Sequence, residues 1–518
     1  MVTRYTNRLT RSLLLILLYV LPPGFARTAD EDYSILSYDI VIEPDFMSKR
    51  IAVDVSIHIS NPSLLNTFEF GLSDHYTTVS VLADSAPTTF ERGEGGIAVK
   101  LARPSADFTL RFQLAGSPGR SVDENRSVIE DSSLFLLWSD RFYPIDFDKW
   151  APVRTALLLP PGFQAIAPGH PIGTDLRSGK ILHMYEASRP TIAFSVFADA
   201  RWQKSESSVN GIKMRTFLYP ESVRFQEQIV ASSADVLRYY SDALCPYPYD
   251  EFSFVEIDSI FARRAFPGFV AYSPKHLEKE FSSTGYDAHE TALLWWVYTT
   301  RGSGPGSFQW TEGFGDYSEI MYALEKGKPI SRTFQQFRDE YLNTPATSDL
   351  VYTELQGNTP QKLIHGRYPW LMHILRYVVG DQAFARGIHL LFSRYRYKTF
   401  TMEEFISTLE EGTGQSLDWW RTEWLERRGV PDILVSCSTT KLGSAYEIKC
   451  TLQQKGNIYH FPLEVAFDLQ SGEHIETVHL TGEVQTFALH SSTPLKGVRL
   501  DPKGWILMKS TVASLNDR

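Results

Sequence analysis

The sequence lacks several features that would place it in a large class of proteins. It has no run of Lys and Arg long enough to follow a phosphate backbone, and its formal net charge is -10, so a nucleic-acid partner is not expected. It contains no internal repeat, no low-complexity segment and no Ser-His-Asp or Cys-His signature of a nucleophilic hydrolase. Beyond Ala29, no segment is apolar enough to cross a membrane.

Cysteine is scarce, with three residues among 518. Cys437 and Cys450 flank a short polar stretch that contains Gly443, which predicts opposite strands of a hairpin. In an exported protein these two side chains could form a disulfide, and two buried thiols are the alternative. Cys245 lies in CPYPY with no His nearby in the sequence, which favours a structural thiol over a nucleophile.

The one long apolar run, LLLILLYVL at 13–21, stands near the N-terminus. Three arginines precede it, prolines end it, and small residues follow as far as Ala29. The run is too short to span a bilayer, so the pattern predicts a cleaved secretory signal over residues 1–29, with an uncleaved anchor as the alternative. The protein is therefore expected to be secreted or periplasmic.

Hydrophobic periodicity divides the remaining chain into three parts. Residues 30–201 read as β structure, because apolar and polar residues alternate as they do from Ile51 to Ile59. Residues 202–431 mix strands, such as FSFVEID and GFVAYS, with helices. Residues 432–518 return to short strands separated by turn residues, which predicts a small β-sandwich. The helices expected in the middle part are 222–244, 287–300, one from Glu312 onward, 368–379, and one that begins with a capping box at Thr401 and Glu404.

The most informative stretch, HETALLWWVYTTRGSGPGSFQWTEGFGDYSE, begins at His289. In a gluzincin the pattern HExxH places two imidazoles on one helical face, where both reach one zinc ion, and the Glu between them polarises the bound water. Here His289 and Glu290 hold the first two places, but Leu293 stands where the second His is needed. Glu312, which follows Leu293 after eighteen intervening residues, has the spacing of a third ligand.

This pattern resembles that of the M1 family of zinc aminopeptidases, whose third ligand lies in an NEGFA-type motif. CPYPYDEFSFVEI, GFVAYS and WLERRGVP also resemble segments of that family, so the resemblance covers most of the chain. It implies a multidomain α+β protein with an N-terminal β-saddle, a thermolysin-like α/β domain and a C-terminal β-sandwich.

The sequence departs from the family at further positions. The family has a substrate-binding GAMEN motif, followed by a glycine that corresponds to Gly268, itself a substrate-binding position. In this alignment the motif falls on residues 262–266 and ends at Phe266. The Glu that binds the substrate's amine in the family is therefore replaced by Ala265. Arg263 and Arg264 are expected either to line a substrate site that prefers a carboxylate or to form a solvated pair in a loop. His365 falls at the place of the family's catalytic Tyr, so Glu290 and His365 are at most vestigial catalytic residues.

These departures favour a secreted pseudopeptidase that binds a peptide or protein, with no cofactor expected. The first alternative is an active zinc aminopeptidase in which another residue, His365 first, replaces the missing ligand. A hydrolase that uses the remaining carboxylates is a second. His289 and Glu312 are either an incomplete metal site or a core histidine bonded to Glu312 or Glu290. The tryptophans that either line the site or fill the core are Trp295, Trp296 and Trp310.

Overall fold

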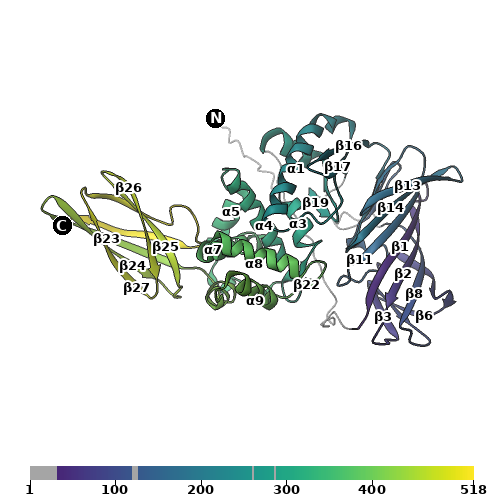
Figure 1. Cartoon of the computed structure of the whole chain (residues 1–518), viewed down its shortest axis with the longest axis horizontal. Helices are drawn as coiled ribbons and strands as arrows, with labels where there is room; N and C mark the ends of the chain where they lie inside the picture. The colour runs from purple at the N-terminus through teal and green to yellow at the C-terminus, as the bar shows by residue number, and fades with distance from the viewer. Residues whose placement is uncertain (1–31, 119–126, 259–261, 285–287, 518) are drawn as a thin grey trace, which may run out of the picture. The chain divides into compact units, whose positions relative to one another are not determined.

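The computed structural model describes residues 32–118, 127–258, 262–284 and 288–517 (Figure 1). The predicted signal peptide lies outside the described residues. The chain forms two compact units, one of residues 1–232 and 249–286 and the other of residues 233–248 and 287–518. This division does not test the boundaries of the three predicted domains, which remain a prediction.

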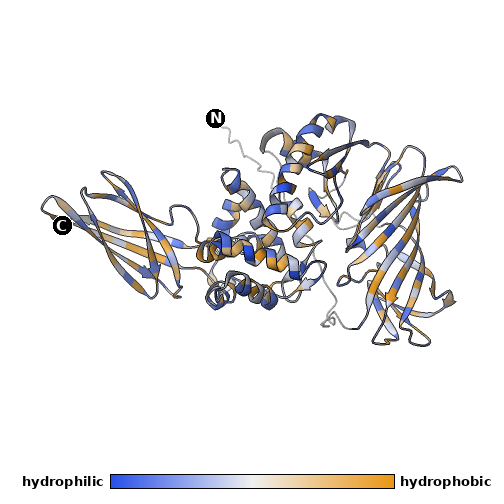
Figure 2. Cartoon of the chain, in the orientation of Figure 1, coloured by the Kyte–Doolittle hydropathy of each residue, from blue (hydrophilic) through white to orange (hydrophobic). Residues whose placement is uncertain are grey.

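The largest sheet of the first unit has eight strands in the order β13-β14-β11-β1-β2-β8-β4-β5. Alternate residues of β2 are buried, as the sequence pattern predicts, and Figure 2 shows hydrophobic and hydrophilic residues alternating along these strands. The bounds are β13 (His170–Arg177), β14 (Lys180–Thr191), β11 (Ala151–Leu159), β1 (Ser34–Asp45), β2 (Arg50–Ser60), β8 (Asp107–Gly116), β4 (Tyr76–Ala83) and β5 (Ala86–Pro87).

Two smaller sheets complete the β-rich part of this unit, in the orders β12-β15-β10-β9 and β3-β7-β6. Their elements are β3 (Thr67–Gly71), β6 (Thr89–Gly93), β7 (Gly96–Lys100), β9 (Val128–Ile129), β10 (Ser133–Leu136), η1 (Trp138–Asp140), β12 (Gln164–Ile166) and β15 (Val196–Asp199).

A five-stranded sheet of the first unit has the order β16-β17-β18-β20-β19. Strands β17, β18 and β20 are parallel, and β19 pairs antiparallel at the edge. The predicted strands FSFVEID and GFVAYS are β18 and β20. The elements here are β16 (Gln203–Val209), β17 (Ile212–Leu218), η2 (Pro220–Phe225), β18 (Glu251–Glu256), β19 (Arg263–Phe266), β20 (Phe269–Tyr272), α2 (Pro274–Lys279) and the π-helix η3 (Glu280–Thr284).

The second unit begins within α1 and contains the helices that surround His289. The capping box is confirmed, because the Glu404 N–H donates to Thr401 Oγ1 and the Thr401 N–H donates to Glu404 Oε2. The elements are α1 (Gln226–Ala243), α3 (His289–Trp296), β21 (Arg301–Gly302), α4 (Ser307–Glu325), α5 (Arg332–Leu342), η4 (Ala346–Ser348), η5 (Tyr352–Glu354), α6 (Gln361–Ile364), α7 (Tyr368–Val379), α8 (Asp381–Arg394), β22 (Thr399–Phe400), α9 (Met402–Thr413), α10 (Asp418–Trp420) and the π-helix η6 (Arg421–Leu425).

The C-terminal part of the second unit has two sheets, in the orders β27-β24-β23-β29 and β26-β25-β28. Phe467 and Phe487 touch across them, with ring centroids 6.1 Å apart. Cys437 and Cys450 face each other on β23 and β24 and form a disulfide, which confirms the predicted hairpin. The strands are β23 (Asp432–Leu442), β24 (Ala445–Gln454), β25 (Phe461–Leu469), β26 (Gly472–Leu480), β27 (Val484–Ser491), β28 (Leu495–Leu500) and β29 (Lys509–Asp517).

Among the described residues, no helix combines the length and the apolar composition that a membrane crossing requires.

Candidate functional site

Helices α3 and α4 of the second unit carry the candidate zinc-site residues. Every residue of α3 is buried, including the polar side chains His289, Glu290 and Thr291 at its start. Trp296 fixes α3 to α4, since its Nε1 donates to Ser318 Oγ at 2.8 Å. The three tryptophans named above are at most 1% exposed, which confirms that they belong to the core. The packing of these two helices therefore holds His289 against α4.

His289 lies between two carboxylates of α4. Its Nε2 is 3.3 Å from Glu312 Oε2, and its Nδ1 is 2.8 Å from Asp316 Oδ1. Glu312 and Asp316 are four residues apart, so they lie on one face of the helix. The other oxygen of Asp316, Oδ2, is 2.5 Å from Nδ1 of His365. We call His289, Glu312, Asp316 and His365 the histidine–carboxylate cluster.

Within the cluster, His289 and Asp316 shift each other's pKa toward the charged form. Burial, the largest effect, would lower the pKa of His289, but the charge of Asp316 and hydrogen bonds to Asp316 and Glu312 outweigh it and raise that pKa well above 6.5. Burial would likewise raise the pKa of Asp316, yet its interactions with His365 and His289 hold it well below the usual range. Both shifts favour the charged forms of His289 and Asp316 in this cluster.

Leu293 fills the space beside His289 on the same helix. A Cβ atom at Gly315 of α4 would lie 2.7 Å from Leu293 Cδ2, which is too close for two carbon atoms. Leu293 is also only 7% exposed, so it has little room to move away. Gly315 thus accommodates the leucine that stands in the place of the second histidine.

The predicted substrate-binding residues lie in the first unit. Arg263 and Arg264 belong to β19, where they pair with Tyr272 and Ala271 of β20, so the expected solvated loop is wrong. A short run with two arginines has no clear strand pattern, and pairing with β20 decides its structure. Arg263 Nη1 is 3.6 Å from Glu280 Oε1. Gly268 has a φ of +82° in the turn between these strands, a conformation that favours glycine.

The structure thus brings together three of the predicted residues, His289, Glu312 and His365. Glu290, the adjacent candidate, is buried on α3 with 7% exposure. Asp316, which joins the two histidines, was not predicted. Its signal in the sequence is the acidic residue four positions after Glu312, on the same face of a helix.

Comparisons with known proteins add the family context. No protein-family profile matches the chain. Aminopeptidase N of Lactococcus lactis is 28% identical over 36% of this chain and 24% of its own length. A probable aminopeptidase 2 of Sulfurisphaera tokodaii is 22% identical over 27% of this chain and 20% of its own length. The chain therefore spans about a quarter or less of the length of these relatives.

Solved structures match over far more of the chain. Aminopeptidase A of Legionella pneumophila, in complex with aspartic acid, covers 93% of this chain with a TM-score of 0.75 and 14% identity, and 60% of that protein is matched. An M1 zinc metallopeptidase of Deinococcus radiodurans covers 77% of this chain and is matched over 95% of its own length, with a TM-score of 0.66 and 17% identity. The chain has the M1 aminopeptidase fold. The predicted resemblance and the multidomain α+β class are thereby confirmed.

The M1 fold implies a zinc ion, and the donors of this chain fit it only in part. Ligands bonded to a tetrahedral zinc at about 2.0–2.2 Å lie about 3.3 Å from each other, and His289 Nε2 and Glu312 Oε2 have that separation. The remaining position, that of the second histidine, is occupied by the aliphatic Leu293. Within the parts of the chain that the structure describes, no group of three or more His, Cys, Asp or Glu side chains is arranged to hold a metal ion. The described donors therefore do not complete an M1 zinc site.

Proposed function

We propose that this protein is an exported M1-fold pseudopeptidase, which binds a peptide or a protein and does not hydrolyse it. The observation that carries the proposal is Leu293, an aliphatic side chain on the same helix as His289, at the place where the HExxH pattern has its second histidine. An aliphatic side chain has no electron pair to donate to a metal ion. Without a metal to polarise water, Glu290 is not a competent base for peptide hydrolysis.

Export is supported by two independent features. The N-terminal apolar run has the length of a secretory signal. The disulfide between Cys437 and Cys450 is typical of proteins that fold in an oxidising compartment, such as the periplasm or the extracellular space.

Peptides with an acidic first residue are the first ligands to test. The amine-binding Glu of the family is replaced by Ala265, and two arginines precede it. Aspartic acid, moreover, is the ligand bound in the structure of the Legionella pneumophila aminopeptidase A. Binding of labelled peptides that begin with Asp or with Leu, measured by fluorescence anisotropy, tests this preference.

A second candidate, a zinc aminopeptidase with a substitute ligand, is favoured by one observation. Histidines that bind metals usually donate their other ring N–H to a carboxylate, and Asp316 accepts from Nδ1 of His289 in this way. His365, the predicted substitute, contacts Asp316 rather than Glu312 in the described contacts. A substitute site would therefore use the other ring nitrogen of His365, Nε2, as the metal donor while Nδ1 stays on Asp316.

Metal analysis of the full chain separates the two candidates. After incubation with zinc and desalting, we expect the wild type to retain well below one zinc per chain and to show no chelator-sensitive turnover of aminoacyl chromogens. Leu293→His should raise zinc retention because it adds a third donor, whereas the matched variant Leu293→Met, which adds no imidazole, should not. We expect little aminopeptidase activity even in Leu293→His, because Ala265 still replaces the amine-binding Glu. About one zinc per wild-type chain together with chelator-sensitive turnover would refute the pseudopeptidase.

A further inference from the structure

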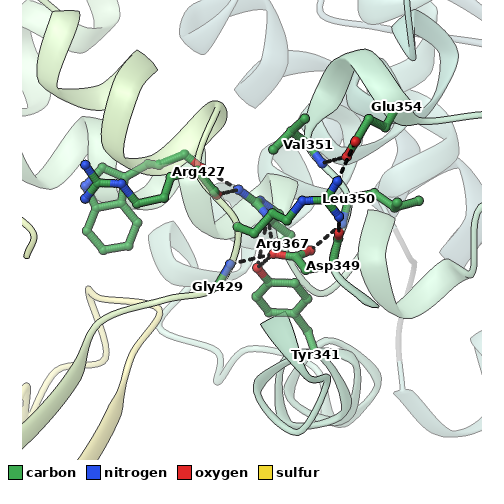
Figure 3. A network of polar contacts seen from close by, with 10 residues as sticks. Tyr341, Asp349, Leu350, Val351, Glu354, Arg367, Arg427 and Gly429 are labelled. Atoms are coloured by element: carbon green, nitrogen blue, oxygen red, sulfur yellow. Dashed lines mark hydrogen bonds and ion pairs between the residues drawn. The ribbon is translucent and has the colours of Figure 1, made fainter. Parts of the chain in front are cut away.

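A buried ion pair between Arg367 and Asp349 lies near the cluster but outside it. Both side chains are at most 2% exposed. Arg367 immediately precedes α7, and Asp349 follows η4. Arg367 Nη1 donates to Asp349 Oδ2, which also accepts from Tyr341 Oη of α5 at 2.9 Å (Figure 3). Both Nη atoms of this buried guanidinium have partners, whereas its Nε has no hydrogen-bond partner among the described residues.

The same pair fixes the segment that leads into the C-terminal sheets. Arg367 Nη2 donates to the carbonyls of Trp424 at 2.7 Å and Arg427 at 2.6 Å, at the end of η6. The N–H of Gly429 donates to Asp349 Oδ2 at 2.8 Å, three residues before β23 begins. Arginine is well suited to this place because its planar guanidinium group can donate hydrogen bonds to several acceptors at once (Figure 3).

Only Gly366 separates Arg367 from His365 of the cluster. A Cβ atom at Gly366 would lie 2.3 Å from the carbonyl oxygen of Lys362 and 2.4 Å from that of Phe337. The ring of His365 stacks on Phe337 with centroids 5.1 Å apart. The backbone at Gly366 is therefore closely packed on the side where a Cβ would lie. A displacement of Arg367 is expected to reach His365.

We propose that Arg367 is a positioning residue, whose contacts with Asp349 and with the carbonyls of Trp424 and Arg427 set the place of His365 against Asp316 in the histidine–carboxylate cluster. This coupling does not depend on the proposed function, because it concerns how the cluster is held, whether or not a metal binds there. It has the form of a contiguous chain of packed and hydrogen-bonded groups within the second unit.

The test compares two arginine variants of the full chain by NMR of ¹⁵N-labelled histidine. Arg367→Met removes the proposed coupling. Arg428→Met is the matched control, because Arg428 contacts Asp349 and Glu354 at the same segment but is not next to His365 in the chain. We expect the imidazole signals of His365, assigned from their loss in His365→Gln, to shift by more than a line width in Arg367→Met and to stay in place in Arg428→Met. Arg367→Lys should restore them in part, since an ammonium can still reach one acceptor.

Unchanged His365 signals in Arg367→Met, or equal shifts in both variants, would overturn the proposal. If Arg367→Met does not fold, Asp349→Asn tests the same coupling, because it removes the charge of the pair and leaves the contacts of Arg367 to Trp424 and Arg427. Shifted His365 signals are then expected, and unchanged signals in folded Asp349→Asn would refute the coupling. Zinc content and turnover do not enter this comparison, so its failure and that of the pseudopeptidase proposal are distinguishable.

Discussion

The contact between Leu293 and Gly315 gives the sharpest prediction about the site. Gly315 lies inside α4, where exchanging glycine for alanine stabilises a helix by about 1 kcal/mol when there is space. Here the new Cβ would lie 2.7 Å from Leu293 Cδ2, and overpacking of a buried site costs about 1–3 kcal/mol. Gly315→Ala should therefore leave the free energy of unfolding unchanged or lower it by up to about 2 kcal/mol.

The sign of this effect should reverse once the leucine is shortened. Leu293→Ala alone should lower the free energy of unfolding by about 2–5 kcal/mol, because it leaves a cavity. In that background the overlap is gone, so Gly315→Ala should stabilise the protein by about 1 kcal/mol. The two substitutions are thus expected to be coupled by about 1–3 kcal/mol.

Urea unfolding of the four proteins, followed by tryptophan fluorescence, measures this coupling, since Trp295 and Trp296 are buried on α3. Gly313→Ala is the matched control in the same helix. Its Cβ would meet the Cβ of Tyr368 at 2.4 Å, so it should destabilise the protein regardless of residue 293. Effects of Gly315→Ala and Leu293→Ala that add within about 0.5 kcal/mol would refute the packing argument.

Two further predictions concern the second unit. Replacing Cys437 and Cys450 together by alanine should lower the free energy of unfolding by about 3 kcal/mol, since the disulfide closes a loop between two residues with a sequence separation of 13. An unchanged thermal midpoint would contradict this. Burial and then the charge of Arg376 lower the pKa of His373 to about 3. An unfolded histidine takes up a proton near pH 6.5, so stability should fall as the pH falls from about 6.5 toward 3, by up to about 1.4 kcal/mol per pH unit. His373→Gln should show a smaller slope in urea titrations across this range, and an equal slope would show that His373 does not contribute.

Local sequence signals predicted the elements whose structure is decided locally. Alternation from Ile51 to Ile59 predicted β2 of the first sheet, and the turn at Gly443 placed Cys437 opposite Cys450. The bounds of α7 were predicted without error, because its apolar face has helical spacing over its full length.

Elements that depend on distant partners were harder to predict. Strand β29 was missed, since it is held by parallel pairing with β23, more than 70 residues earlier in the chain. Helix α4 begins at Ser307, whereas the sequence predicted a helix from Glu312 onward. The start was predicted too late because Gly304 and Gly306 are typical of a loop. In both cases tertiary contacts override a weak local pattern.

The sequence predicted the candidate site and its missing ligand, but it did not predict Asp316 as the partner of the two histidines. The spacing of residues in the sequence shows where a ligand is missing, whereas the partner of a buried side chain is seen only in the contacts of the folded chain. Leu293 shows that a metal donor is missing, but it does not show which groups bond the buried imidazoles of His289 and His365. Asp316 answers it by contacting both histidines, so the buried rings of His289 and His365 keep a polar partner although residue 293 is a leucine. It follows that a histidine at position 293 adds a metal donor but leaves the contacts of Asp316 with His289 and His365 in place. Because a histidine ligand must be deprotonated, metal binding at this site should release protons and weaken as the pH falls.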